Sequence, residues 1–372
     1  MSVFIDICES IRLFFRTHAN IEINISTPTI DPNENGHIRF YLKRNLEPVL
    51  KMLAENLDAI DHYHQFLDYA SIWLKTDLWT DSVIKQILTQ GSRYGSNNLC
   101  QNTEILVVAD ECDDSVTSLR ISLLKNAFQN LAVWNGYIIG NNGLKFLLSK
   151  KNNSNLTNLV ICGNVVPNIT SKEYKQQKHD DISKMCASRT DNSSDYPIDI
   201  ISKLCHSSIV YELLCTRHNK VIRVQHATSN KDKGIFIMYN YSRLCQVLAV
   251  YEKNYTDNYY RALPDIEDIN FKVLQKTEEW ILIFNYLSVF PSIIQECTKY
   301  LSSAHIGVYK LCSFLVEMSS CVSSFYHKHN ILMDPLPHFL PLMYARLYLV
   351  KALIQVYENA FHILGIEAAR EI

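Results

Sequence analysis

Residues 337–364, PHFLPLMYARLYLVKALIQVYENAFHIL, carry the strongest helical pattern in the chain. Four polar residues in this stretch are spaced by four, three and four positions, so they form one stripe along a helix. They are Lys351, Gln355, Glu358 and His362. Almost every other position is apolar or small, which predicts a helix at the centre of a helical bundle.

Residues 235 to 336 continue this helical character, and no strand pattern persists there. Further helices are predicted over residues 235–255, 276–287, 291–301 and 305–328. The C-terminal third is therefore predicted to be all-helical.

The preceding part of the chain mixes short strands with helices. Residues 104–109 and 158–166 are apolar runs typical of buried parallel strands, and residues 21–25 alternate as a half-buried strand would. Residues 38–61 and 116–131 have helical spacing. Alternating strands and helices predict an α/β domain with a largely parallel sheet.

Two polar segments in this part have no apolar pattern of their own. Residues 168–199 are rich in Ser, Asp, Asn and Lys, which predicts a mobile loop or linker. Asp110, Glu111, Asp113 and Asp114 follow the strand at 104–109, where α/β folds sometimes bind metals or substrates. A solvated loop is the alternative explanation for this acidic cluster.

The overall charge argues against strong non-specific binding to nucleic acid. The 372 residues include 36 Lys plus Arg and 38 Asp plus Glu, a net charge of -2. Neutralising phosphates requires a basic surface, so DNA is not expected as a partner. Any RNA binding must rest on local patches, shape, stacking or a partner protein.

The cysteines and the hydropathy pattern indicate a cytoplasmic protein. The cysteine count of eleven is odd, no Cys-x-x-Cys pair occurs, and Cys205–His206 is the only Cys–His adjacency, so neither a disulfide framework nor a zinc site is expected. No run approaches the roughly 18 apolar residues that a membrane span needs, and no membrane association is expected. Residues 1–16 contain Asp6 and Glu9 and do not read as a secretory signal.

Three segments of the C-terminal third resemble arginyl-tRNA synthetases. Phe236–Leu244 resembles the opening helix of their anticodon domain, with the pattern aromatic-x-x-Tyr-x-x-x-Arg-Leu. Tyr286–Ile293 resembles a central segment, and Ala345–Ala352, leading to Leu364–Ala369, resembles the closing segment. In these enzymes the polypeptide ends shortly after the Leu-Gly-Ile turn, and this chain ends at Ile372, at the corresponding place.

The N-terminal half resembles the same enzymes in a degenerate form. Glu34-Asn-Gly36-His37 is similar to the His-x-Gly-His signature that holds ATP at the start of a helix, with Glu34 in place of the first His. A carboxylate there repels phosphates, whereas imidazole donates a hydrogen bond to them. The segment beginning at Lys184, Lys-Met-Cys-Ala-Ser-Arg, is similar to a decayed second signature. The resemblance implies a vestigial nucleotide site at Glu34, Gly36, His37 and Lys184, with no catalytic residue and no cofactor.

The resemblance also implies the domain organisation. It gives an α/β degenerate class I synthetase-like, Rossmann-type domain at residues 1–200 and a connecting segment at 201–233. An all-α DALR anticodon-binding helical bundle follows at 234–372. No tRNA-elbow domain is expected before Ile21. The two signatures lie closer together than in the intact enzymes, which implies that much of the catalytic insertion is missing.

In function, the resemblance implies a non-catalytic subunit that binds arginine tRNAs. Its relatives present these tRNAs to a tRNA methyltransferase that makes 3-methylcytidine in the anticodon loop. Residues 234–372 carry 11 Lys plus Arg against 13 Asp plus Glu, so this segment alone is expected to bind tRNA weakly. A specificity subunit working with a basic catalytic partner suits that balance.

The residues expected to contact tRNA are those that match positions bordering the anticodon pocket. They are Arg243, Tyr326, His327 and Ile372. Arg346, which lies on the packed side of the predicted helix at 337–364, is a further candidate. Exposed aromatics and arginines stack on splayed loop bases or hydrogen-bond to them. Each also has a structural alternative: core packing for Tyr326, a bridge between helices for Arg243, and an internal ion pair for Arg346.

Two other functions remain open from the sequence. One is an active arginyl-tRNA synthetase, which requires an ATP site despite Glu34. The other is a scaffold that has lost tRNA binding and holds proteins only.

Overall fold

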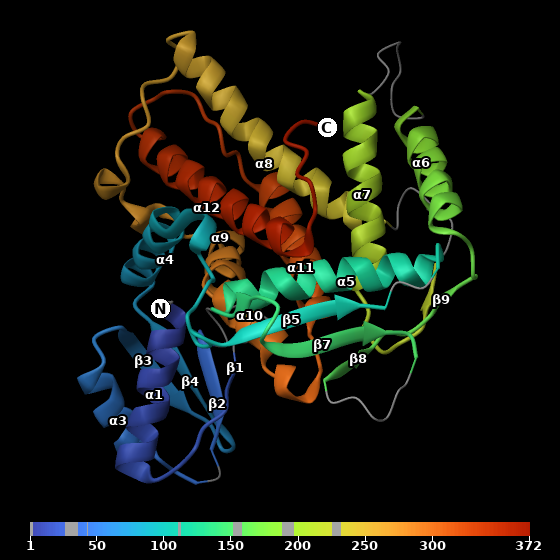
Figure 1. Ribbon diagram of the computed structural model, residues 1–372. Coiled ribbons are helices and arrows are strands. Elements are labelled where there is room, and N and C mark those ends of the chain that lie inside the picture. The colour runs from blue at the N-terminus through green and yellow to red at the C-terminus, as the bar shows by residue number, and fades with distance from the viewer. Residues whose placement is uncertain are drawn as a thin grey trace. The chain divides into compact units, whose positions relative to one another are not determined.

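The computed structural model describes residues 3–26, 36–42, 44–110, 113–151, 158–187, 197–224 and 232–372 (Figure 1). The chain divides into two compact units, and each is assembled from three separate stretches. The first unit consists of Met1–Tyr94, Leu248–Pro291 and Cys321–Val356. The second unit consists of Gly95–Val247, Ser292–Ser320 and Tyr357–Ile372. The C-terminal third therefore contributes to both units.

The first unit contains an antiparallel sheet with the strand order β1-β2-β4-β3. Its strands are β1 (Ile25–Ser26), β2 (Ile38–Tyr41), β3 (Ile60–Gln65) and β4 (Tyr69–Leu74). The predicted helix over residues 38–61 is wrong, because this stretch forms two strands with only a short helix between them. The partner that stabilises β2 is β4, about 30 residues further along the chain, with Phe40 opposite Ala70.

Helices cover one face of this sheet. They are α1 (Val3–Ala19), α3 (Glu47–Asn56) and α4 (Thr76–Gln90), and η1 (Gly91–Arg93) follows α4. The apolar side of α1 is buried, and the ring of its Phe15 meets Phe40 of β2 edge to face at 5.1 Å. Large aromatic side chains contribute the most buried area to such a small core.

The remaining elements of the first unit come from the C-terminal third. They include η2 (Ile266–Asp268), η3 (Phe271–Val273), α9 (Thr277–Ile281) and the π-helix η4 (Leu282–Leu287). Phe284 of η4 stacks on His37 at 4.1 Å and on Trp79 at 6.2 Å. The helical stretch Thr277–Thr298 is long and apolar enough to cross a membrane, but 56% of its most apolar window is buried, as in a core helix.

The second unit contains a parallel sheet with the order β6-β5-β7-β8. Its strands are β5 (Glu104–Ala109), β6 (Ile138–Ile139), β7 (Leu144–Ser149) and β8 (Leu159–Ile161). A further parallel pair joins β9 (Val165–Val166) to β10 (Ile222–Arg223). The predicted strand at 104–109 and the predicted parallel sheet are confirmed, whereas the single strand predicted at 158–166 forms two short strands, β8 and β9, in different sheets.

Three helices accompany this parallel sheet: α5 (Val116–Trp134), α6 (Ser171–Ala187) and α7 (Ile198–Leu214) (Figure 1). The prediction of a loop over residues 168–199 is wrong for its described part, because α6 occupies most of it. Tyr174, Lys178 and Ile182 recur every four residues and form the buried stripe of α6. The buried Lys178 is balanced by Glu212, with 2.7 Å between Nζ and Oε2, and by Asp232 at 3.7 Å.

The helices predicted in the C-terminal third are confirmed. They are α8 (Lys233–Thr256), α10 (Phe290–Thr298), α11 (Val308–Lys328) and α12 (Leu340–Leu364), and η5 (Leu301–Ser303) precedes α11. Most residues of α12 are fully buried, and its predicted polar stripe is the side that remains partly exposed. The chain thus combines an α/β N-terminal region that contains a parallel sheet with a helical C-terminal region.

The burial of His37 predicts acid sensitivity of the first unit. His37 is 4% exposed, its Nδ1 accepts a hydrogen bond from the amide of Leu74 at 2.7 Å, and burial lowers its pKa to about 4. Protonation therefore favours the unfolded chain. The contribution of this group is complete above pH 6.5 and is lost as the pH falls towards 4, a change of about 3 kcal/mol.

Chemical denaturation between pH 7 and pH 4 measures this effect, with His37→Asn as the matched variant. The Asn side chain offers an acceptor near the position of Nδ1 but does not titrate. We expect the variant to be less stable at pH 7 and to show a flatter pH profile. Parallel profiles for the two proteins contradict the assignment.

Candidate nucleic-acid interface

Helix α8 presents Tyr239 and Arg243 on one exposed side. Ile237, Met238 and Tyr241 are buried on the opposite side. Since residues four apart lie above one another on a helix, Tyr239 and Arg243 are neighbours on the surface. The sequence places an aromatic ring and a guanidinium together there.

Arg243 stacks on Tyr239. The guanidinium carbon lies 4.1 Å from the centre of the ring, and Nη2 donates a hydrogen bond to the phenol oxygen at 2.8 Å. Tyr239 is 37% exposed. A flat cation held against an aromatic face offers stacking surfaces to an unpaired nucleobase.

The C-terminal tail lies beside the same part of α8. Helix α12 ends at Gly365, whose φ of +71° suits glycine, and the amide of Ile366 donates back to the carbonyl of Phe361 at 2.9 Å. The hydroxyl of Ser242 then donates to the carbonyl of Arg370 at 3.0 Å. The turn at Gly365 therefore returns the tail to the residue next to Arg243.

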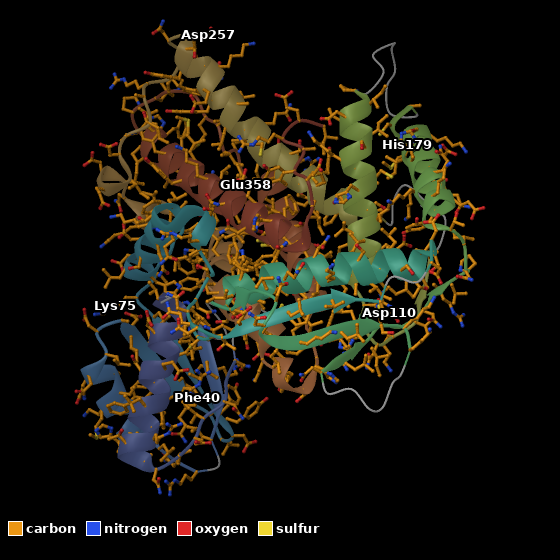
Figure 2. All side chains as sticks on the ribbon, viewed as in Figure 1. Phe40, Lys75, Asp110, His179, Asp257 and Glu358 are labelled. Carbon is orange, nitrogen blue, oxygen red and sulfur yellow. The ribbon has the colours of Figure 1, made fainter. Side chains whose placement is uncertain are left out.

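Two side chains near the chain end hold this arrangement. Glu358 accepts hydrogen bonds from the phenol of Tyr241 at 3.0 Å and from the guanidinium of Arg370 at 2.9 Å (Figure 2). The side chain of Arg370 remains 72% exposed, and Ile372 is half-buried. Arg243, Arg370 and Ile372 thus belong to one surface of the second unit, which we name the tail surface together with Tyr239.

Tyr326 and His327 lie elsewhere, in the first unit near the end of α11. Tyr326 is half-buried and His327 is exposed, and their rings meet edge to face at 6.2 Å. The next two residues, Lys328 and His329, both bind Glu278. Burial raises the pKa of Glu278, but the hydrogen bonds from the Lys328 ammonium and the His329 ring outweigh it and hold the pKa at about 2.

Arg346 is not an RNA contact, and this part of the prediction is wrong. Its side chain is 5% exposed, and Nε lies 2.7 Å from Oε1 of the fully buried Glu279. Nη1 also donates to the carbonyl of Asn330 at 2.7 Å. The alternative that the sequence offered, an internal ion pair, is confirmed.

The described residues of the expected nucleotide site belong to different units. Glu34 lies outside the described residues. Gly36 has a φ of +81°, and a Cβ there would lie 2.9 Å from Cβ of Ser71, so this glycine serves a tight approach of two strands. His37 precedes a strand, not a helix, and its ring belongs to the core of the first unit. Lys184 lies exposed near the end of α6, in the second unit.

The acidic cluster after β5 serves to cap and tie helices. Asp113 accepts hydrogen bonds from Lys150, Ser115 and Ser118, which lower its pKa. Asp110 accepts one from Ser149 at 2.9 Å. Within the described parts of the chain, no group of three or more His, Cys, Asp or Glu side chains could hold a metal ion.

The sequence analysis missed an aromatic face on the antiparallel sheet. Tyr69 and Trp73 of β4 lie on the side opposite the core of the first unit, since their neighbours in the strand are buried. Arg39 lies 4.5 Å over the ring of Tyr69, and His62 stacks on Trp73 at 4.5 Å. Aromatic side chains on an antiparallel sheet are a common platform for single-stranded RNA. Alternation along β4 was the available signal, and the wrong helix over 38–61 obscured it.

Residues 237–372 match the family model described as the DALR anticodon binding domain. A Danio rerio protein named "DALR anticodon-binding domain-containing protein 3" is 32% identical over 180 residues, covering 45% of this chain and 32% of that protein. The Rattus norvegicus protein of the same name is 29% identical over 226 residues, covering 56% and 41%. The matched region therefore spans less than half the length of these relatives.

Arginyl-tRNA synthetases are similar in both sequence and structure. The arginine–tRNA ligase of Halobacterium salinarum is 21% identical over 207 residues, covering 55% of this chain and 30% of that enzyme. The structure of the Thermus thermophilus arginyl-tRNA synthetase matches with a TM-score of 0.71 at 9% identity, covering 100% of both chains. The Plasmodium falciparum enzyme matches with a TM-score of 0.67 at 13% identity, covering 98% of this chain and 99% of that one. Residues 237–372 thus match the DALR anticodon binding domain, and the chain resembles arginyl-tRNA synthetases in fold.

Proposed function

We propose that this protein is a non-catalytic tRNA-binding subunit that recognises arginine tRNAs and presents them to a tRNA 3-methylcytidine methyltransferase. The match of residues 237–372 to the DALR anticodon binding domain carries the proposal. The tail surface adds a stacked Arg243–Tyr239 pair and the exposed Arg370 to that domain. These groups suit recognition of unpaired anticodon-loop bases.

The burial of His37, which belongs to the segment similar to the first synthetase signature, supports a role without catalysis. His37 packs against Phe284 and is 4% exposed, so its ring is not presented to a nucleotide. The relatives from Danio rerio and Rattus norvegicus are named for the DALR domain and not as ligases. Both observations favour a subunit that binds tRNA and leaves the chemistry to another protein.

The charge balance supports a partner. With 36 basic and 38 acidic residues, the chain is expected to hold tRNA weakly by itself, because affinity for phosphates rises with the number of cations that contact them. A basic methyltransferase joined to the same tRNA raises the effective concentration of each component for the other.

Affinity purification of the protein from cell extract tests this function. Bound small RNAs are sequenced and co-purified proteins are identified. Enriched arginine tRNAs together with an RNA methyltransferase support the proposal. Protein partners without tRNA enrichment favour the scaffold instead.

An active arginyl-tRNA synthetase is the second candidate, favoured by the similarity to ligases such as that of Halobacterium salinarum. Exchange of pyrophosphate into ATP with arginine, with and without tRNA, distinguishes the two. Clear turnover overturns the non-catalytic role.

Replacing Arg243 with alanine is expected to weaken binding of arginine tRNA by about 5- to 150-fold, because a stacking partner contributes about 1–3 kcal/mol per base. Filter binding or fluorescence anisotropy measures the affinity. Lys253→Ala is the control, since it removes one positive charge near the other end of the same helix. Equal loss in both variants shows that charge alone, and not stacking at Tyr239, is responsible.

A further inference from the structure

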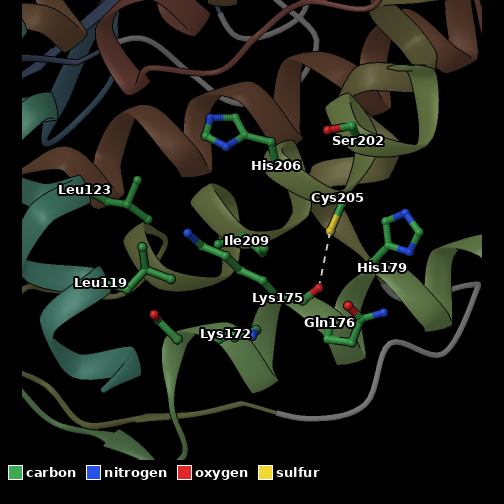
Figure 3. A pocket seen from close by; sticks show the side chains of 11 residues that line it. Leu119, Leu123, Lys172, Lys175, Gln176, His179, Ser202, Cys205, His206 and Ile209 are labelled. Atoms are coloured by element: carbon green, nitrogen blue, oxygen red, sulfur yellow. Dashed lines mark hydrogen bonds between the residues drawn. The ribbon is translucent and has the colours of Figure 1, made fainter. Parts of the chain in front are cut away.

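A groove of about 610 Å³ lies between α5, α6 and α7 in the second unit (Figure 3). Three apolar side chains line it: Leu119 and Leu123 from α5 and Ile209 from α7. Lys172 and Lys175 line it from α6. An apolar wall beside two cations suits a ligand that has both a flat or apolar part and an anionic part.

Among the described residues, no carboxylate neutralises the two lysines. They are three positions apart on α6, so they project from the same side of the helix. Neither forms an ion pair with a carboxylate of the described residues, and no described carboxylate lines the groove. Two neighbouring cations without a counterion repel each other, and an anion bound between them relieves that repulsion.

Three carboxylates on or beside α6 are engaged elsewhere. Glu173 accepts hydrogen bonds from the amide and the hydroxyl of Thr170, at 3.0 and 2.8 Å. Asp180 accepts one from Gln176 at 2.8 Å, and Asp114 accepts the hydroxyl of Ser171. These contacts fix the start of α6 and leave the positive charge of Lys172 and Lys175 for a ligand.

Neutral hydrogen-bonding groups complete the lining. Ser202 and His206 of α7 face the groove, as do Gln176 and His179 of α6 (Figure 3). The Nε2 atom of His206 is within 2.8 Å of the carbonyl of Gly365, where the C-terminal tail begins. The groove is thus joined to the same tail that carries Arg370.

We propose that this groove binds a phosphate ester, with the phosphate at Lys172 and Lys175 and the attached nucleoside against Leu119, Leu123 and Ile209. A backbone phosphate of bound tRNA and a free nucleotide share this chemistry. Only the first of these sources rests on the proposed tRNA-binding function.

Methyl NMR of the full-length protein tests the site directly, with AMP as the probe. We expect AMP to shift the methyl signals of Ile209, Leu119 and Leu123 in a saturable manner. Lys172→Gln with Lys175→Gln is expected to abolish these shifts. Lys125→Gln with Lys145→Gln removes the same charge from the second unit outside the groove and is expected to preserve them.

A second titration with arginine tRNA identifies the source of the phosphate. If the tRNA backbone supplies it, tRNA shifts the same methyl signals. The logarithm of the tRNA affinity of the K172Q/K175Q variant then falls less steeply with the logarithm of salt concentration, by about 1.4 for two lost contacts. If AMP shifts the methyls and the salt dependence is unchanged, the groove takes a free nucleotide.

The possible failures are separable. If the methyl signals respond to neither AMP nor tRNA, the proposal that the groove binds a phosphate ester is wrong. Shifts that persist in K172Q/K175Q contradict it as well. If the protein binds no tRNA but responds to AMP, the proposed tRNA-binding function is wrong and the proposed phosphate-ester site is supported.

Discussion

Replacing Arg346 with methionine is expected to lower the free energy of unfolding by about 3–5 kcal/mol, because it leaves Glu279 as an unpaired buried carboxylate. Glu279 is fully buried and also accepts a hydrogen bond from the amide of Lys276 at 2.9 Å, at the start of α9. The carbonyl of Asn330 loses its donor as well. The cost therefore comes from the two groups left without a donor, the Glu279 carboxylate and the Asn330 carbonyl.

Urea denaturation followed by circular dichroism measures this loss. A double variant, Arg346→Met with Glu279→Met, is the matched control, since replacing both partners of a buried pair by apolar side chains often restores stability. We expect partial recovery, because the Asn330 carbonyl and the start of α9 remain without partners. A single variant of normal stability that binds tRNA less well contradicts the structural role and returns Arg346 to the RNA surface.

Replacing Arg120 with methionine is expected to cost more than about 4 kcal/mol and to reduce the yield of folded protein. Arg120 is 1% exposed, and its guanidinium donates to five backbone carbonyls. The acceptors are those of Leu213, Gly163, Lys220, Thr216 and Arg217, at 2.7–3.4 Å. Burial lowers the pKa of Arg120, and the carbonyls at the C-terminal end of α7 compensate its charge.

Arg120→Lys keeps the charge but supplies three donors where the guanidinium supplies five. We expect a smaller loss of stability, with folded protein recovered for calorimetry. The comparison separates the charge from the geometry of the fork. Equal stability of the methionine, lysine and wild-type proteins contradicts the role assigned to Arg120.

Elements whose pattern is local in sequence were predicted correctly, and elements stabilised by residues far along the chain were not. Helices such as α8 and α12 were predictable because their apolar period is long and continuous. Strand β2 was not, because its partner β4 lies beyond an intervening helix. Helix α6 was missed because its buried stripe includes Lys178, and the residues that balance this charge are Glu212 and Asp232.

In the candidate site too, contacts between residues close in sequence could be predicted and contacts between distant residues could not. The pairing of Arg243 with Tyr239 follows from a spacing of four residues on a predicted helix, so it lies within reach of sequence analysis. The partner of Arg346 is Glu279, 67 positions away, and no local pattern indicates it. Lys172 and Lys175 can be recognised as groove residues only when the structure has brought α5, α6 and α7 together.

The discontinuous make-up of the two units bears on how such a chain can evolve. A recombination breakpoint between residues 233 and 234 would deprive the first unit of Leu248–Pro291 and Cys321–Val356, and the second of its closing stretch Tyr357–Ile372. Loss or gain of the helical half alone would therefore change the residue content of both units. Selection that preserves the helical half is therefore expected to preserve the α/β half as well, because each unit is built from residues of both halves.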